Sequence, residues 1–263
     1  MKSKTVDIYC FTGTGNTYLV AKKIANDLQD NGYLTNVKNM TKFEPQKIDL
    51  SHTIGIGFTV VFWNTFPVVK DFINSLPQGN NTEIFVFTTM GDFSLNAATN
   101  FGCILKNKGY DVIGAKDFLM PNNFIAIQKK EKNIFKIEKA YKKIEIFAKQ
   151  LIDGNAKSCK TNLFFKFFFT ITNFITNRWR IKIFQKIIKF DLNKDKCIKC
   201  KLCFEICPVK NIQIKNDYPI FKEMKCQLCM RCISYCPTHA IKSFLLHKTY
   251  TALSIDEIKK WSN

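Results

Sequence analysis

The chain has 263 residues, and its 40 Lys and Arg residues against 21 Asp and Glu residues give a net charge of +19. A chain of this length has room for about two domains. No run reaches about 18 apolar residues, and the start is too polar for a secretory signal, so we expect neither a membrane span nor export. Eleven cysteines in a chain that is not exported are typical of a reducing compartment, and we expect a cytoplasmic location.

Near the start, residues 5–11 read as a buried strand, and a helical pattern follows that stops near Gly32. The turn between them is Thr12-Gly13-Thr14-Gly15-Asn16-Thr17. Such a turn at a helix N-terminus predicts an anion site, because backbone N–H groups and the helix dipole face the ligand. The turn lacks the lysine of a Walker A loop, and Tyr18 occupies the third glycine position of a dinucleotide fingerprint. Hydroxyl and N–H donors without a cation favour a terminal monophosphate.

The rest of the first half alternates between two patterns. Strand-like runs lie at 34–39, 53–61, 83–89 and 111–119, and helix-like runs lie at 67–76, 94–108 and 133–153. Alternating strands and helices predict an α/β fold with a doubly wound parallel sheet.

Residues 154–190 combine eight basic residues with many aromatic ones and hold no acidic residue. The stretch 163–189 favours one or two amphipathic helices. One interpretation is a connector that packs its aromatics between two domains, and another is a peripheral membrane contact. Nucleic acid is not expected as a partner, because no recognised binding module accompanies the charge. The positive surface favours an acidic redox partner protein.

The last third carries the spacing C-x2-C-x2-C-x3-C-P twice, at an offset of 29 residues. In such runs the first three thiolates bind one cubane and the fourth binds the other, so the pattern predicts two [4Fe–4S] clusters. One cluster is assigned to Cys197, Cys200, Cys203 and Cys236, and the other to Cys226, Cys229, Cys232 and Cys207. Disulfides would need export, and zinc sites do not use this doubled run. His239 and the remaining cysteines, Cys10, Cys103 and Cys159, receive no ligand role.

On these cysteines, residues 190–246 resemble the bacterial dicluster ferredoxins. The turn at 12–17 resembles the flavodoxin phosphate loop, T/S-x-T-G-N-T, which holds the FMN phosphate in that family. The whole chain is similar to the bacterial flavodoxin–ferredoxin fusions. The resemblance implies a flavodoxin-like sheet of order 2-1-3-4-5 in residues 1–153, connector helices at 154–190, a small α+β dicluster ferredoxin domain at 191–246 and a tail at 247–263.

The resemblance also implies that two later loops clasp the flavin ring. The candidates are Trp63, Asn64 and Thr65 after the third strand, and Thr89, Met90 and Gly91 after the fourth. Trp63 suits stacking on the ring, although a core tryptophan is the alternative. The second loop lacks the tyrosine of many flavodoxins, and Phe93 or Met90 is the substitute. The turn at 120–124 is a further possible contact.

The favoured function is electron transfer, with electrons passing between FMN and the two clusters to redox partners. The sequence offers no catalytic triad or paired-carboxylate site, so a carrier is favoured over an enzyme with its own substrate. Two alternatives remain: a flavin-dependent oxidoreductase acting on a small molecule, and a ferredoxin whose first domain is only a docking scaffold.

Overall fold

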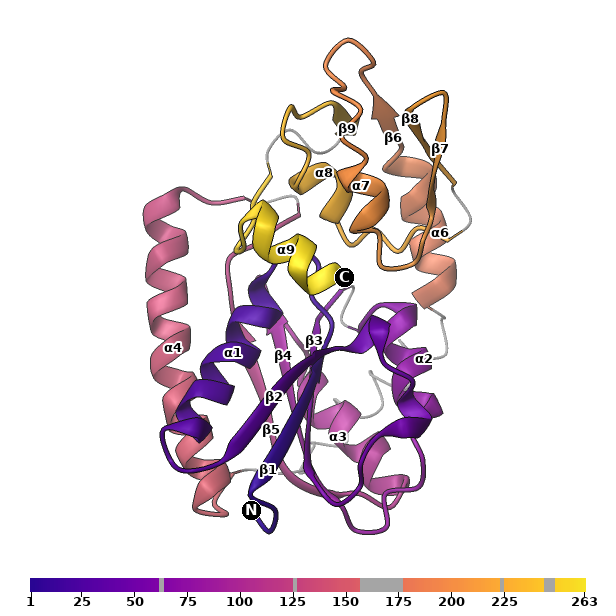
Figure 1. Ribbon diagram of the computed structural model, residues 1–263. Coiled ribbons are helices and arrows are strands. Elements are labelled where there is room, and N and C mark those ends of the chain that lie inside the picture. The colour runs from indigo at the N-terminus through magenta and orange to yellow at the C-terminus, as the bar shows by residue number, and fades with distance from the viewer. Residues whose placement is uncertain (62–63, 125–126, 157–176, 223–224, 244–248) are drawn as a thin grey trace.

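The computed structural model describes residues 1–61, 64–124, 127–156, 177–222, 225–243 and 249–263. Two lobes stand one above the other in Figure 1. We call residues 1–156 the sheet lobe and residues 177–243 the cysteine lobe. The C-terminal segment, residues 249–263, lies between them.

The sheet lobe contains a five-stranded parallel sheet with the strand order β2-β1-β3-β4-β5, which confirms the predicted flavodoxin-like order. The strands are β1 (Thr5–Cys10), β2 (Leu34–Asn39), β3 (Thr53–Thr59), β4 (Glu83–Met90) and β5 (Asp111–Leu119). Helices α1 (Asn16–Gln29) and α4 (Lys130–Ile152) cover one face, and α2 (Pro67–Ser75) and α3 (Ala97–Asn107) cover the other. Two short 3-10 turns, Met40–Lys42 and Pro45–Lys47, follow β2.

The central strands are buried along most of their length and mainly apolar, as expected where helices cover both faces of a sheet. Ile8 of β1 packs with Ile24 and Ile144 on one face, whereas Ile56 of β3 packs with Phe72 and Phe101 on the other. Strand β3 ends at Thr59, two residues before the predicted end, and Val61 pairs with Asn64 through two backbone hydrogen bonds.

The cysteine lobe is a small α+β unit. Its elements are α6 (Asn177–Ile187), β6 (Phe190–Leu192), α7 (Leu202–Glu205), β7 (Ile212–Lys215), β8 (Tyr218–Phe221), α8 (Arg231–Ser234) and β9 (Ile241–Ser243). Two antiparallel pairs, β6–β9 and β7–β8, frame it. Helices α7 and α8 both begin after a residue in the left-handed region, Lys201 with φ 60° and Met230 with φ 65°. The two cysteine repeats therefore share one local backbone shape.

The C-terminal segment, predicted only as a tail, forms helix α9 (Ile255–Ser262). A capping box between Ser254 and Glu257 begins the helix. The ring of Trp261 lies 4.7 Å from that of Tyr18 on α1, and Asn39 donates a hydrogen bond of 2.6 Å to the Trp261 carbonyl. The segment thus ties the chain end back onto the sheet lobe.

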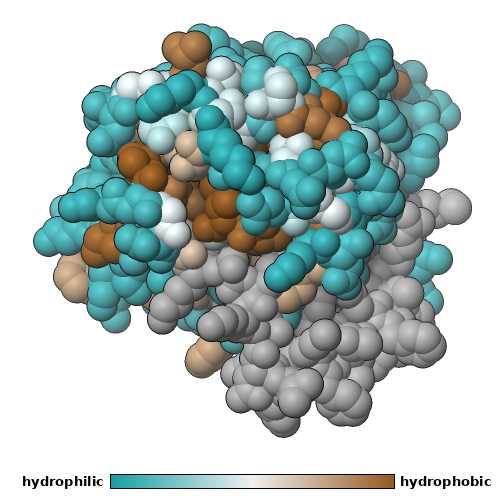
Figure 2. Space-filling model, turned by 90° about the horizontal axis from the view of Figure 1, so that it is seen from below, coloured by the Kyte–Doolittle hydropathy of each residue, from teal (hydrophilic) through white to brown (hydrophobic). Residues whose placement is uncertain are grey.

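Most of the predicted connector, residues 157–176, lies outside the described residues. The described part places Phe184 and Ile188 against the core of the cysteine lobe, while Ile187 is half exposed. Packing of residues 163–176 between the lobes, or on a membrane, stays a prediction. No helix in the described part of the chain is long and apolar enough to cross a membrane. The end of the sheet lobe seen in Figure 2 is mostly hydrophilic, with hydrophobic residues in small separate patches.

Candidate functional site: a cavity between the lobes and two cysteine sets

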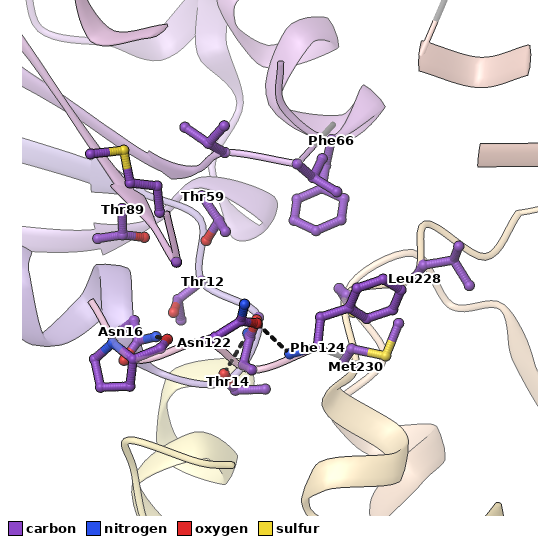
Figure 3. A pocket seen from close by; sticks show the side chains of 18 of the residues that line it. Thr12, Thr14, Asn16, Thr59, Phe66, Thr89, Asn122, Phe124, Leu228 and Met230 are labelled. Carbon is purple, nitrogen blue, oxygen red and sulfur yellow. Dashed lines mark hydrogen bonds between the residues drawn. The ribbon is translucent and has the colours of Figure 1, made fainter. Parts of the chain in front are cut away.

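A cavity of about 380 Å³ lies at the carboxyl edge of the sheet, where the strand order reverses between β1 and β3. Ligands of doubly wound folds bind at this switch point, and the volume is typical of cofactor pockets. Loops after β1, β3, β4 and β5 border the cavity, and the cysteine lobe supplies a further wall through Leu228, Cys229 and Met230. Figure 3 shows Leu228 and Met230 beside Phe124, across from Thr59 and Thr89.

Two threonine hydroxyls of the loop after β1 accept hydrogen bonds that fix its shape. The Gly15 N–H donates to Thr12 Oγ1 at 3.0 Å, and Asn123 Nδ2 donates to Thr14 Oγ1 at 2.7 Å. Helix α1 has no side-chain cap, so the N–H groups of its first turn are left for another acceptor. Of the predicted loop residues, Thr12, Gly13, Thr14 and Asn16 line the cavity. Thr17 does not line it, because its hydroxyl bonds those of Thr59 and Thr89.

Asn16 carries an unpaired polar atom at the cavity. Its Nδ2 donates to the Pro121 carbonyl at 2.8 Å, whereas its buried Oδ1 has no hydrogen-bond partner in the described structure. A buried acceptor without a donor is costly. The hydroxyls of an FMN ribityl chain would supply such a donor, and the uncapped helix N-terminus suits its phosphate. The residues present therefore fit FMN.

The two loop glycines are required by contacts with the rest of the chain. Gly15 has φ +110°, and a Cβ there would lie 2.7 Å from Leu253 Cγ. The C-terminal segment therefore makes the close approach at Gly15, and Gly15 is not among the residues that line the cavity. A Cβ on Gly13 would lie 2.5 Å from the Cys229 carbonyl oxygen. The backbone of the cysteine lobe thus rests directly on the phosphate-type loop.

The other predicted ring contacts divide into two groups. Thr89, Met90 and Gly91 line the cavity, and the loop at 121–124 lines it as well. Asn64 and Thr65 are fully buried behind it, where Thr65 Oγ1 donates to the Thr59 carbonyl at 3.1 Å. Trp63 lies outside the described residues. Phe93, the substitute for a flavodoxin tyrosine, lines the cavity and is 78% exposed.

Sequence reasoning missed part of the wall. The residues are Thr59, Val60, Val61, Phe66, Asp92, Leu228 and Met230. Thr59 to Val61 end a predicted strand whose neighbours were candidates, so strand-end position was an available signal. Leu228 and Met230 stand between cysteines of the second repeat, and nothing in their spacing indicates that they face another domain.

The eight repeat cysteines gather at two smaller cavities. Cys197, Cys200, Cys203 and Cys236 border one, which we call the outer set. Cys207, Cys226, Cys229 and Cys232 border the other, which we call the inner set. These are the two groupings predicted from the spacing. Within the described residues, no group of three or more His, Cys, Asp or Glu is arranged to hold a single metal ion. In a cubane, each thiolate binds a different iron atom.

Backbone N–H groups and burial shape the electrostatics of both sets. The N–H groups of Asn211, Leu228 and Ala240 donate to the sulfurs of Cys207, Cys226 and Cys236 at 3.2, 3.4 and 3.2 Å. Such donors stabilise negative charge on sulfur. Burial raises the pKa of Cys203 to about 11 and that of Cys226 to about 12. Burial thus disfavours the free thiolates, and binding to iron releases the thiol protons.

Helix α8 joins the inner set to the cavity. Arg231 donates from Nε and Nη2 to the Thr12 carbonyl at 3.1 and 2.7 Å, and the Tyr235 hydroxyl donates to the Thr14 carbonyl at 3.0 Å. The Ala252 N–H donates to the same Thr14 carbonyl at 2.7 Å. The loop that borders the cavity is therefore fixed by the helix that carries Cys232.

Comparisons with known proteins agree with the cysteine pattern. Residues 196–240 match the 4Fe-4S dicluster domain family. The chain is 36% identical over 55 residues to a ferredoxin of Methanothermococcus thermolithotrophicus, covering 92% of that protein and 20% of this chain. It is 38% identical over 66 residues to an uncharacterized ferredoxin of Methanocaldococcus jannaschii. That match covers 24% of this chain and 44% of the relative, so the chain spans under half of that protein.

Solved flavodoxins are similar to the sheet lobe. Flavodoxin 2 of Bacillus cereus aligns with 57% of this chain and 98% of its own, at 14% identity and a TM-score of 0.45. The fold assignment itself stands on the observed strand order.

The fold and the two cysteine sets define an iron–sulfur protein whose chemistry is one-electron transfer. Through its C-terminal region, the chain belongs to the dicluster 4Fe–4S ferredoxins. It joins this domain to a flavodoxin-like domain, as a flavodoxin–ferredoxin fusion does.

Proposed function

We propose that this protein is an electron carrier that binds FMN in the cavity between the lobes and relays electrons between the flavin and its two clusters. One observation carries the proposal: Leu228, Cys229 and Met230, from the loop of the inner set, form a wall of the flavodoxin-type cavity. A ligand in that cavity touches the loop that binds a cluster. This arrangement favours the relay over a scaffold whose first domain binds nothing.

Different residues of the cavity would bind different parts of FMN. The first turn of α1 and Thr14 would hold the phosphate of FMN, and Asn16 Oδ1 would accept a hydrogen bond from a ribityl hydroxyl. Phe66, Met90 and Leu228 form an apolar wall that keeps water from the ring. Bound FMN would supply both one- and two-electron chemistry, which lets it connect to one-electron clusters.

The outer set lies at the surface and supports a proposal for the partner. Cys200 is exposed, and its neighbour Ile198 is 62% exposed. Lys199 and Lys201 flank Cys200 in the sequence and are also exposed. An apolar tip with lysines around it suits an acidic redox protein, because complementary charge steers the encounter and raises its rate. We also propose a cytoplasmic location, since free thiols persist in reducing compartments.

Flavin binding by the anaerobically purified full-length protein tests the proposal. Wild type is expected to bind FMN at least tenfold more tightly than riboflavin, because the phosphate satisfies the N–H groups of α1. Asn16→Ala is expected to weaken both ligands by about tenfold through loss of one buried hydrogen bond. Asn31→Ala, at an exposed position after α1, is the matched control. Equal affinities of wild type for FMN and riboflavin would refute the phosphate assignment.

The relay has its own test. The protein is loaded with FMN, the flavin is photoreduced without oxygen, and cluster absorbance is followed. Bleaching of the clusters together with reoxidation of the flavin supports the relay. Reduced flavin beside oxidised clusters that still accept electrons from dithionite would reject it.

A further inference from the structure

The two cysteine repeats differ in charge at one buried position. At the offset of 29 residues, Arg231 of the second repeat corresponds to Leu202 of the first. Each is the first residue of its short helix and each is buried, at 1% and 3% exposure. A cation thus replaces a leucine beside the inner set alone.

Arg231 is satisfied entirely by neutral groups. Besides the Thr12 carbonyl, its Nη1 donates to the Ile206 carbonyl at 3.1 Å and to Ser262 Oγ at 3.3 Å. Its guanidinium carbon lies 5.6 Å from the centre of the Phe11 ring. No ion pair to Arg231 is present among the described residues.

A buried cation without a counter-charge is strongly destabilising. The inner set is the source of negative charge beside Arg231, because Arg231 lines the same cavity as the four inner cysteines and does not line the cavity of the outer set. An oxidised cubane with four thiolates carries a net charge of about −2, and reduction by one electron makes it more negative. The cluster of the inner set therefore provides the missing counter-charge. Because the reduced cluster is more negative, Arg231 stabilises the reduced state more than the oxidised state.

We propose that Arg231 is a positioning and redox-tuning residue that raises the reduction potential of the inner cluster above that of the outer one. The cluster takes up one electron and its charge changes by one. Arg231 keeps its proton, so no proton accompanies the electron. The inner cluster, which lies against the cavity, is then the preferred site of the first electron in the lobe. The proposal depends on the two clusters and not on FMN.

The potentials of both clusters in anaerobically loaded full-length protein test this proposal. Arg231→Leu copies the first repeat and is expected to lower the one-electron equilibrium constant of the inner cluster at least tenfold, which is about 59 mV. The outer cluster is expected to keep its potential. Arg231→Lys retains the charge and is expected to retain most of the potential.

Lys225→Leu is the matched control. Lys225 is exposed and precedes Cys226. Its replacement by leucine therefore removes one positive charge near the inner set, as Arg231→Leu does. Water and salt screen an exposed charge, and its loss is expected to shift the potential much less. Serine variants of Cys197 and Cys226 assign each signal to its cluster.

Three results would overturn the proposal: equal shifts in Arg231→Leu and Lys225→Leu, a shift in the outer cluster, or no shift in a variant with full iron content. Wild type provides a test that does not depend on the variant folding. The gap between the two potentials is expected to persist in 1 M salt, because a buried charge is screened little. Collapse of the gap in salt would assign it to surface lysines instead.

Discussion

The two cysteine repeats have the same ligand spacing, but they lie in different environments. The outer set opens to the surface at Cys200, whereas the inner set meets the sheet lobe through Cys229. The difference arises from residues between the ligands. Arg231 and Tyr235 of the second repeat bond the loop after β1, while Leu202 and Ile206 stand at the equivalent places in the first. Cysteine spacing thus sets which cluster forms, and the intervening side chains set where that cluster sits.

The largest effect is expected from removing the fourth cysteine of a repeat, because that cysteine binds the cluster of the other repeat. Cys207→Ala is expected to damage the cluster built by Cys226, Cys229 and Cys232, although Cys207 is nearer in sequence to the outer cysteines. Cys236→Ala is expected to damage the outer cluster. Wild type should hold about eight iron atoms per chain, and each variant about four. Iron analysis with electron paramagnetic resonance checks this, and zinc in the wild type would contradict the assignment.

The environments of the two sets also predict an order of loss. A chelator or oxygen is expected to attack the outer cluster several-fold faster, because Cys200 is exposed, whereas the four inner cysteines are only partly exposed and Cys229 packs against the sheet lobe. Iron release followed by absorbance should therefore have two phases. Arg231→Leu removes the hydrogen bonds from α8 to the Thr12 carbonyl, so the rates of the two phases are expected to become more similar. A single phase in wild type would mean that the lobes do not protect the inner set.

Gly13→Ala is expected to disturb the contact between the loop after β1 and the inner set. The added Cβ would lie 2.5 Å from the Cys229 carbonyl, and such overpacking costs about 1–3 kcal/mol. Hydrogen exchange should rise both at residues 12–17 and in α8. Gly32→Ala is the control, since its Cβ would meet nothing within 4 Å and only its backbone at φ +81° is strained. Unchanged hydrogen exchange in α8 of Gly13→Ala would show that the Cys229 carbonyl moves aside without disturbing α8.

Tyr235→Phe is expected to have the smallest effect. It removes only the hydrogen bond to the Thr14 carbonyl and costs about 1 kcal/mol of stability. Thermal unfolding of the loaded protein measures the change. The control, Tyr218→Phe, alters a partly exposed tyrosine of β8 and should be near neutral. A larger loss from Tyr218→Phe would place the sensitive contacts within the cysteine lobe.

Local patterns were sufficient for much of this molecule. The apolar run before Thr12 predicted β1, and the spacing of the cysteines predicted two sets that the structure gathers at separate cavities. Strand ends were less well placed, since β3 ends at Thr59 beside the pairing of Val61 with Asn64, a contact that no local pattern predicts. Helix α9 was missed because it is short, and its apolar residues pack on α1 of the sheet lobe.

The sequence by itself determined the two cysteine sets, the alternation of strands and helices, and a loop fit for a phosphate, because each depends on short-range spacing. The order of the parallel sheet was implied only by the resemblance to flavodoxins. Only the tertiary structure decided that Leu228 and Met230 close the cavity, that Leu253 occupies the space beside Gly15, and that Arg231 is a buried cation without an acid. These features join residues separated by more than 200 positions. No local pattern encodes such contacts, since they depend on how two separately folded surfaces meet.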